Sequence, residues 1–126
     1  MILPIGFVSP GQLGEIDVPA ATSILTSSGT AVIDCSLGEV FSAQLLSATT
    51  AASFTNVPAS GTPCFIILIV AQGYSPAGAL TWPAGVKWSG GVAYVPSTTY
   101  GAQDTVGLMT ADGGTTWYGV ANKGFA

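Results

Sequence analysis

Residues 64–71 read Cys-Phe-Ile-Ile-Leu-Ile-Val-Ala, the longest apolar run in the chain. Four of these eight side chains are isoleucine or valine, the β-branched types that favour strands over helices. A near-continuous apolar run of this length is typical of a strand buried on both faces, as in a packed β-sandwich or at the centre of an oligomer. It is far shorter than the ~20 residues that a membrane-spanning helix needs.

Shorter strands are predicted on both sides of this run, cut by Gly, Pro, Asn and Ser turns. The predicted strands are 30–36, 39–46, 52–57, 64–71, 79–82, 86–88, 92–95, 104–110 and 115–121. The pair Asp112-Gly113 between the last two is a strong hairpin signal. No segment keeps helical spacing over three turns, and 17 glycines and 8 prolines oppose long helices. We therefore expect an all-β fold, an antiparallel β-sandwich or jelly roll of seven to nine short strands.

Residues 1–28 differ from the rest, because prolines and glycines interrupt their apolar residues. Such a segment makes a poor central strand, so we expect an extended N-terminal arm before a β-sandwich domain at 29–126. We expect this arm to lie extended along a surface, either its own or that of a neighbouring protein. The residues expected to bind a partner are Ile2, Leu3, Ile5, Phe7, Val8, Leu13 and Ile16. The start of the chain has no basic residue and no long apolar core, which is not typical of a signal peptide.

Charged residues make up only 6% of the 126 residues, against about 25% in an ordinary domain. There is no arginine and no histidine, and the net charge is −4. Such a surface carries little repulsion between copies, which favours an oligomer or a part of a larger assembly. Two lysines cannot neutralise a nucleic-acid backbone or bind an anionic membrane, so we expect neither partner.

The titratable residues predict no catalytic, metal or cofactor site. Without histidine there is no Ser-His or Cys-His pair, and two cysteines are too few for structural zinc. The six carboxylates are Glu15, Asp17, Asp34, Glu39, Asp104 and Asp112. Their spacing singles out no glycosidase pair and no calcium-binding loop, although Asp104 or Asp112 with nearby carbonyls could supply oxygen ligands to calcium. We therefore expect no enzyme.

The two cysteines, Cys35 and Cys64, both lie in apolar, strand-like contexts. A free cysteine behaves as a small hydrophobic residue, so buried free thiols are the favoured interpretation. A single disulfide is the alternative, if the two strands are neighbours.

Residues 81–91, Thr-Trp-Pro-Ala-Gly-Val-Lys-Trp-Ser-Gly-Gly, combine two tryptophans with turn residues. Pro83 ends a strand and Gly85 permits a sharp turn, which predicts a rigid double corner. Aromatic side chains here and nearby could either fill the core and interfaces or offer flat faces to a sugar. These candidate glycan-binding or interface aromatics are Trp82, Trp88, Tyr94, Trp117 and Tyr118.

Three stretches together resemble a structural domain of tailed bacteriophages. They are GEVFSAQLLSATTAASFTNVPASGTPCFIILIV (38–70), ALTWPAGVKWSGG (79–91) and DTVGLMTADGGTTWYGVANKGFA (104–126). The most specific motifs are WPAGVKW and DGGTTWYG, and the resemblance extends over 31–126. It occurs in tail-fibre or receptor-binding tips and in small capsid-associated proteins.

This resemblance implies a virion structural protein with a β-sandwich fold, assembled in the host cytoplasm as a homotrimer. Only about 28 residues precede the domain, which favours a capsid decoration (cement) protein that binds the major capsid protein or another virion protein. The alternative is a tail-fibre or receptor-binding tip that recognises a host-surface glycan.

Overall fold

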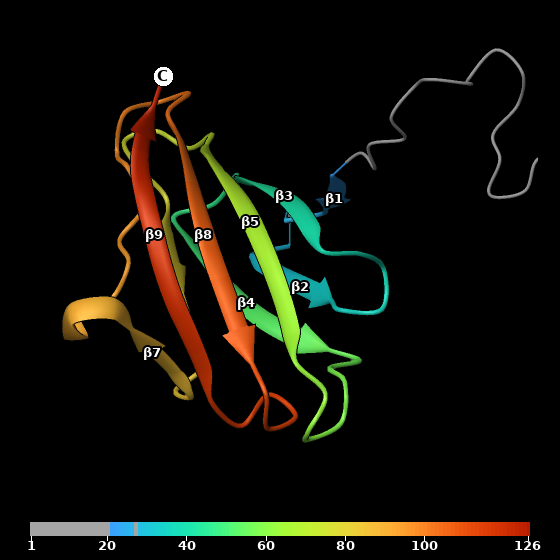
Figure 1. Ribbon diagram of the computed structural model, residues 1–126. Coiled ribbons are helices and arrows are strands. Elements are labelled where there is room, and N and C mark those ends of the chain that lie inside the picture. Colours follow the sequence, from blue (N-terminus) through green and yellow to red (C-terminus); the bar gives the residue numbers. More distant parts are fainter. Residues whose placement is uncertain (1–20, 27) are drawn as a thin grey trace, which may run out of the picture.

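The computed structural model describes residues 21–26 and 28–126, which fold into strands and one short 3₁₀ turn at Ser89–Gly91 (Figure 1). The strands are β1 (Thr22–Ile24), β2 (Thr30–Asp34), β3 (Val40–Leu45), β4 (Thr49–Thr55), β5 (Cys64–Gln72), β6 (Ala79–Thr81), β7 (Val86–Trp88), β8 (Gln103–Thr110) and β9 (Trp117–Phe125). The prediction of an all-β fold is thus confirmed for this part of the chain. In the described ranges no helix is long and apolar enough to cross a membrane.

The strands form a six-stranded sheet in the order β1-β3-β5-β8-β9-β7 and a three-stranded sheet in the order β2-β4-β6. The expectation of antiparallel pairing is right only for β5–β8 and β8–β9, and the other five pairs are parallel. The physical reason is the path of the chain. From β1 to β6 successive strands alternate between the two sheets, so each sheet receives its next strand after a crossover and in the same direction.

One core serves both sheets. In Figure 1 the strand β4 passes behind β8 and β5, and β2 lies behind and to the right of β5. The buried cluster contains Ile33 and Ala52 from the smaller sheet and Phe41, Leu68 and Val106 from the larger one. The inward residues alternate with outward ones along each strand, as a pleated strand requires.

The hairpin expected at Asp112-Gly113 is present between β8 and β9. Gly113 and Gly114 have φ values of +74° and +90°, in the left-handed region that favours glycine. The Asp112 carboxylate accepts a hydrogen bond of 2.8 Å from the Thr116 N–H and one of 3.0 Å from the Thr110 hydroxyl. This turn therefore follows from its local sequence.

The strand expected at 92–95 is wrong, because these residues form no strand. The preceding Gly90 and Gly91 both have positive φ, at +73° and +76°, and turn the chain away from β7. Residues 92–95 then run beside β9 without pairing, and Tyr94 points inward.

The seven arm residues expected to bind a partner lie outside the described residues. Thr22–Ile24, near the end of the predicted 1–28 arm, forms β1 and pairs in parallel with β3 at an edge of the six-stranded sheet. The preceding residues thus join the described chain at that edge.

Candidate functional site

The double corner at 81–91 packs tightly against the start of β9. A Cβ atom on Gly85 would lie 2.3 Å from the Thr115 carbonyl oxygen, so only glycine fits there. The Trp117 N–H donates a 3.0 Å hydrogen bond to the Gly85 carbonyl. The corner is therefore fixed by backbone contact with the end of the β8–β9 hairpin.

The aromatic residues that the sequence singled out form a continuous cluster between the sheets, apart from Tyr118. The Trp117 ring, only 1% exposed, stacks on Phe54 of β4 with centroids 4.2 Å apart. Phe54 in turn lies 6.5 Å from Trp82, and Trp82 meets Trp88 edge to face at 5.3 Å. Such geometry is favourable between aromatic rings. This cluster joins the two sheets through the corner.

Two of these rings have limited access for a ligand. Trp88 is half-buried and lies on the backbone of Gly119, where a Cβ atom would come within 2.6 Å of the indole. The Trp82 Nε1 atom is buried and has no hydrogen-bond partner among the described residues. That N–H therefore does not face outward toward a sugar hydroxyl.

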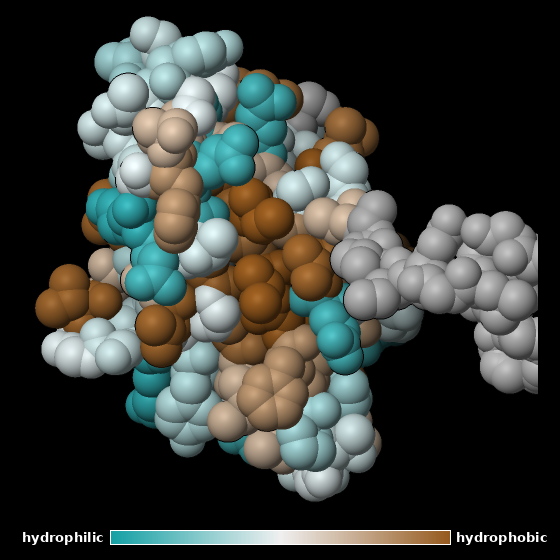
Figure 2. Space-filling view, turned by 45° about the horizontal axis from the view of Figure 1, so that its top comes forward, coloured by the Kyte–Doolittle hydropathy of each residue, from teal (hydrophilic) through white to brown (hydrophobic). Residues whose placement is uncertain are grey.

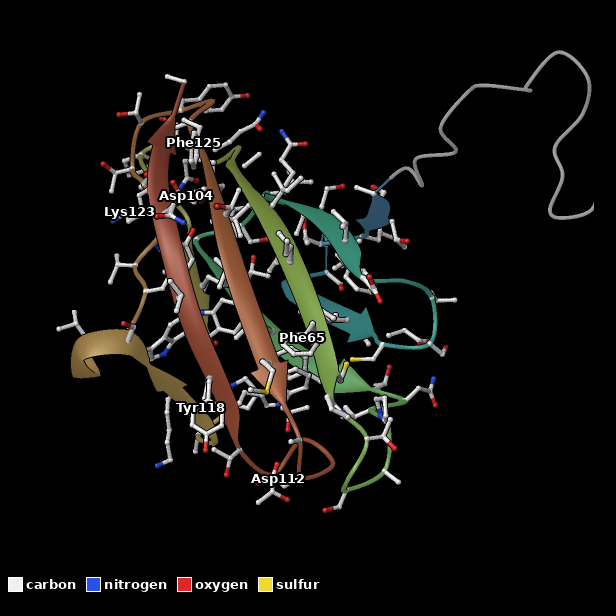
Figure 3. The ribbon with its side chains drawn as sticks, in the orientation of Figure 1. Phe65, Asp104, Asp112, Tyr118, Lys123 and Phe125 are labelled. Atoms are coloured by element: carbon white, nitrogen blue, oxygen red, sulfur yellow. The ribbon has the colours of Figure 1, made fainter. Side chains whose placement is uncertain are left out.

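Tyr94 is the last ring of the cluster and contacts Trp82 and Trp88. Its hydroxyl meets the carboxylate of Asp104, a residue of β8 that is only 1% exposed and is labelled in Figure 3. Asp104 accepts four hydrogen bonds: 2.6 Å from the Tyr94 hydroxyl, 2.7 Å and 2.6 Å from the N–H and hydroxyl of Ser97, and 2.9 Å from the Gly124 N–H. The carboxylate thereby ties the loop after β7 and the end of β9 to β8.

Burial is the largest single influence on Asp104 and on its own raises the pKa. The hydrogen bonds from Ser97, Tyr94 and Gly124 together outweigh it and lower the pKa below the ordinary value. Burial, followed by the interaction with Asp104, raises the pKa of Tyr94, so its hydroxyl stays a donor. The pair is a structural anchor, since every carboxylate contact is used to hold backbone or side chains.

A hollow of about 410 Å³ opens beside this cluster. Its lining includes Trp88, Val92, Tyr94, Val120 and Lys123. It thus combines aromatic and aliphatic walls with one of the two lysines of the chain. Small-molecule sites have this kind of mostly apolar lining with few polar groups.

A second candidate site is the outer side of the six-stranded sheet, which carries exposed apolar side chains. The alternation of β5 leaves Phe65 and Ile67 exposed, so the prediction of burial on both faces is wrong for a single chain. We call the outward apolar residues the outer apolar face: Val40, Phe65, Ile67, Ile69, Met109, Tyr118 and Val120. Figure 2 shows hydrophobic residues gathered over the middle of the molecule, with hydrophilic ones around them.

Register places the members of this face side by side. Val40 pairs with Ile67, and Phe65 pairs with Met109, which pairs with Tyr118. The outward positions of β3, β5 and β8 carry no charged residue. In Figure 3 the labelled rings of Phe65 and Tyr118 project from this side of the sheet.

The remaining titratable groups are scattered. Asp34 accepts hydrogen bonds from Ser36 and Asn56, which lower its pKa, and the Thr116 N–H lowers the pKa of Asp112. Among residues 21–26 and 28–126, no group of three or more His, Cys, Asp or Glu side chains could hold a metal ion. Cys35 and Cys64 are both free.

Sequence reasoning missed two features of this arrangement. The sequence places Asp104 at the start of a strand and offers it as a possible calcium ligand, but it gives no sign of the buried hydrogen bonds, because the partners Tyr94, Ser97 and Gly124 are 7 to 20 residues away. The outer apolar face was hidden because the apolar run 64–71 shows no alternation. The alternation of β8, in which Gln103 and Thr105 face outward while Val106 and Leu108 are buried, marks one side of the sheet as the outward one. Pairing of β5 with β8 would then have placed Phe65 and Ile67 on that side.

In comparisons with known proteins, no family model matches this chain, and neither does any curated protein or solved structure.

Proposed function

We propose that this chain is a non-enzymatic structural subunit that assembles with copies of itself through the outer apolar face. The observation that carries the proposal is β5, which is apolar on both faces but buried on one. A strand of that composition is typical of a position covered on both sides. Contiguous exposed apolar patches commonly mark protein–protein contact sites.

The charge distribution supports the same proposal. Both lysines lie beyond the middle of the face, Lys87 on β7 and Lys123 near the end of β9. The central cores of interfaces are depleted of charge while their rims are polar. Phe65 and Tyr118 would act as the aromatic anchors that dominate interface energetics.

We further propose that this structural subunit is a bacteriophage virion protein. Its support is the resemblance of 38–70, 79–91 and 104–126 to phage structural domains. We propose that the two sheets with their shared core are the layers of a β-sandwich, that the assembly is a homotrimer, and that it decorates the head. A ligand that binds only the assembled shell stabilises it by mass action. Residues 1–20, which precede the edge strand β1, would contact a neighbouring subunit or the major capsid protein.

Self-association is tested by light scattering during size-exclusion chromatography. The expected mass is three times the 12.6 kDa of one chain. Phe65→Glu, at a position 64% exposed, should give a folded monomer. The matched control is Leu37→Glu, at a position 62% exposed outside this face, which should leave the mass unchanged. A monomeric parent protein, or equal effects of both substitutions, would refute assembly through this face.

Location is tested by immunogold electron microscopy of virions. Gold over the head supports decoration, and purified protein should then co-sediment with shells that lack it. Gold at the tail contradicts decoration and favours the recognition function. Virions without gold at any site would refute the virion assignment while leaving self-association intact.

A glycan-binding tip is the second candidate, favoured by the 410 Å³ hollow that Trp88 and Lys123 line. An aromatic face beside a hydrogen-bond donor suits a sugar ring. Binding of the purified oligomer to a glycan array, lost in Lys123→Ala and Trp88→Ala but kept in Lys87→Ala, would establish it. No binding to any glycan would leave decoration as the function.

A further inference from the structure

The outer edge of β9 is only partly paired. β7 pairs with residues 117–119 of β9 and then ends, because Gly90 and Gly91 have positive φ and turn the chain away. Residues 92–95 run beside the next part of β9, but within the described chain no backbone hydrogen bond joins them to it. The sheet therefore has an open edge directly after the end of β7.

This open edge presents backbone groups to the hollow of about 410 Å³. The Trp117 N–H points to the β7 side of the strand, because it donates to the Gly85 carbonyl. Successive residues of a strand turn their backbone groups to opposite sides, so Ala121 turns the same way as Trp117. Ala121 lines the hollow, and no described residue outside the strands bonds to its backbone. One more strand can pair with it there.

The hollow suits an extended apolar peptide that carries an acidic group. Trp88, Val92, Val95 and Val120 supply apolar walls, and Lys123 is the single charged residue among the described residues that line it. Val120 also belongs to the outer apolar face. The hollow therefore continues the surface that we propose for self-assembly.

Residues 11–18, Gly-Gln-Leu-Gly-Glu-Ile-Asp-Val, have the matching composition and lie outside the described residues. Pro10 and Pro19 bound the stretch, which contains no proline of its own, so each of its N–H groups is available to a strand ladder. Glu15 and Asp17 are the only carboxylates of residues 1–20. Their charge is opposite to that of Lys123.

A chain cannot place its own copy of this stretch beside its own β9. β1 and β9 lie on opposite sides of the six-stranded sheet (Figure 1). A strand added outside β9 would lie five strand spacings from β1, roughly 24 Å. Asp17 precedes Thr22 of β1 by five residues, which span at most about 18 Å when fully extended. The added strand must therefore come from another copy.

We propose that residues 11–18 of a neighbouring copy add a strand to the open edge of β9 and pair Glu15 or Asp17 with Lys123. The inference rests on the proposed self-assembly and deepens it by naming where the arm binds. Donor and acceptor lie at opposite edges of one sheet, so each copy gives an arm to one neighbour and receives an arm from another. Head-to-tail contacts of this kind form closed rings, which agrees with the proposed homotrimer.

The first test is cross-linking with a carbodiimide, which joins a carboxylate directly to an amine that it contacts. Isotopically light and heavy chains are mixed in urea, refolded together, cross-linked and digested. Links between Lys123 and Glu15 or Asp17 should join a light peptide to a heavy one. Lys87, exposed on β7, is the internal control and should form few such links. Links only between peptides of the same isotope, or equally frequent links to Lys87, would overturn the proposal.

Amide hydrogen exchange tests the added strand itself. In the assembled parent, the Ala121 N–H should exchange at least about tenfold more slowly than in Ile16→Pro, whose proline interrupts the added strand. Ile5→Pro makes the same substitution in the arm but outside 11–18, and it should keep the slow exchange. Equal exchange in all three proteins would contradict strand addition.

Light scattering separates this inference from the proposed function. A monomeric parent would refute self-assembly and the arm contact with it. An oligomeric parent whose Lys123 forms no link to Glu15 or Asp17 would refute the arm contact alone. Glycan binding by the oligomer that depends on Trp88 and Lys123 would also overturn the proposal, because a strand seated in the hollow would close it to a sugar.

Discussion

At the scale of single residues, Asp104 supports more structure than its size suggests. It accepts four hydrogen bonds from Tyr94, Ser97 and Gly124 while almost fully buried. Asp104→Asn places an amide against N–H groups that need an acceptor. We expect it to lower the free energy of unfolding by about 3 kcal/mol, measured in urea. Tyr94→Phe removes one hydrogen-bond donor and should lower the free energy of unfolding by only about 1 kcal/mol. Equal losses of stability in the two variants would contradict the central role of the Asp104 carboxylate.

The same residue predicts a pH dependence. Its pKa is lower in the folded protein than the ordinary value of 3.8. A carboxyl group with a depressed folded pKa contributes stability above its unfolded pKa, and this contribution is lost as pH falls through the folded pKa. Urea unfolding from pH 6 to pH 2 should therefore show a gap between the parent and Asp104→Asn that narrows below pH 3.8. A gap that stays constant would show that the charge is not the cause.

Gly85 is the second residue on which the fold depends. The 2.3 Å that a Cβ atom would leave to the Thr115 oxygen is a backbone clash that no side-chain rotation relieves. Gly85→Ala should therefore cost about 2 kcal/mol or more, by moving the corner off the hairpin. Gly61→Ala is the comparison variant. A Cβ atom at Gly61 would meet no neighbouring atom, so only the positive φ of this residue opposes the substitution. Thermal melts of both variants decide whether close contact or conformation dominates.

At the scale of elements, β8 carries a glycine at the centre of the outer apolar face. Gly107 pairs with Ile67 and Val120, and a Cβ atom there would find ordinary space, 3.8 Å from the nearest atom. Gly107→Ala should stabilise the isolated chain by about 0.5–1 kcal/mol, because it restricts the unfolded state. This gain should be measured by urea unfolding in the Phe65→Glu background, because that variant is expected to be monomeric and its stability then has no contribution from assembly. In the parent background the added methyl should weaken association, and unchanged association would place the contact elsewhere.

The positions of strands could be predicted from the sequence where the signal is local. The pairing of one strand with another could not be predicted. Positions 86–88 match β7, and the Asp112-Gly113 turn marks the hairpin, since both depend on adjacent residues. Parallel pairing, such as that of Val40 with Ile67, depends on crossovers between sheets that leave no local pattern. The same limit hid the partners of Asp104. Four of the candidate aromatic residues do lie in the cluster, as the tendency of large rings toward burial favours, but the sequence left open whether they bind a glycan and did not indicate Phe54.

At the scale of the whole molecule, the role of residues 1–20 can be separated from that of the fold. A chain that begins at Ala21 keeps β1 and all the buried residues of the described part of the chain. Its unfolding midpoint in urea should match that of the full chain, because none of the described contacts is lost. Its attachment to capsids should weaken by at least tenfold in co-sedimentation if the arm contacts a neighbour. Equal attachment of both chains would refute that role.

The alternation of strands between two sheets governs how the chain can fold. Among the nine described strands, only β8 and β9 are neighbours both in sequence and in a sheet. Every other pair requires closing a long loop before any contact forms, and such topologies fold slowly, in milliseconds to seconds. On the ribosome, β5 emerges after its parallel partner β3 but before its antiparallel partner β8. The backbone edge of β5 that pairs with β8 therefore stays open during synthesis, next to the exposed apolar side chains of the strand. A chaperone that shields residues 64–72 at that stage would decide how much of the protein reaches its folded state.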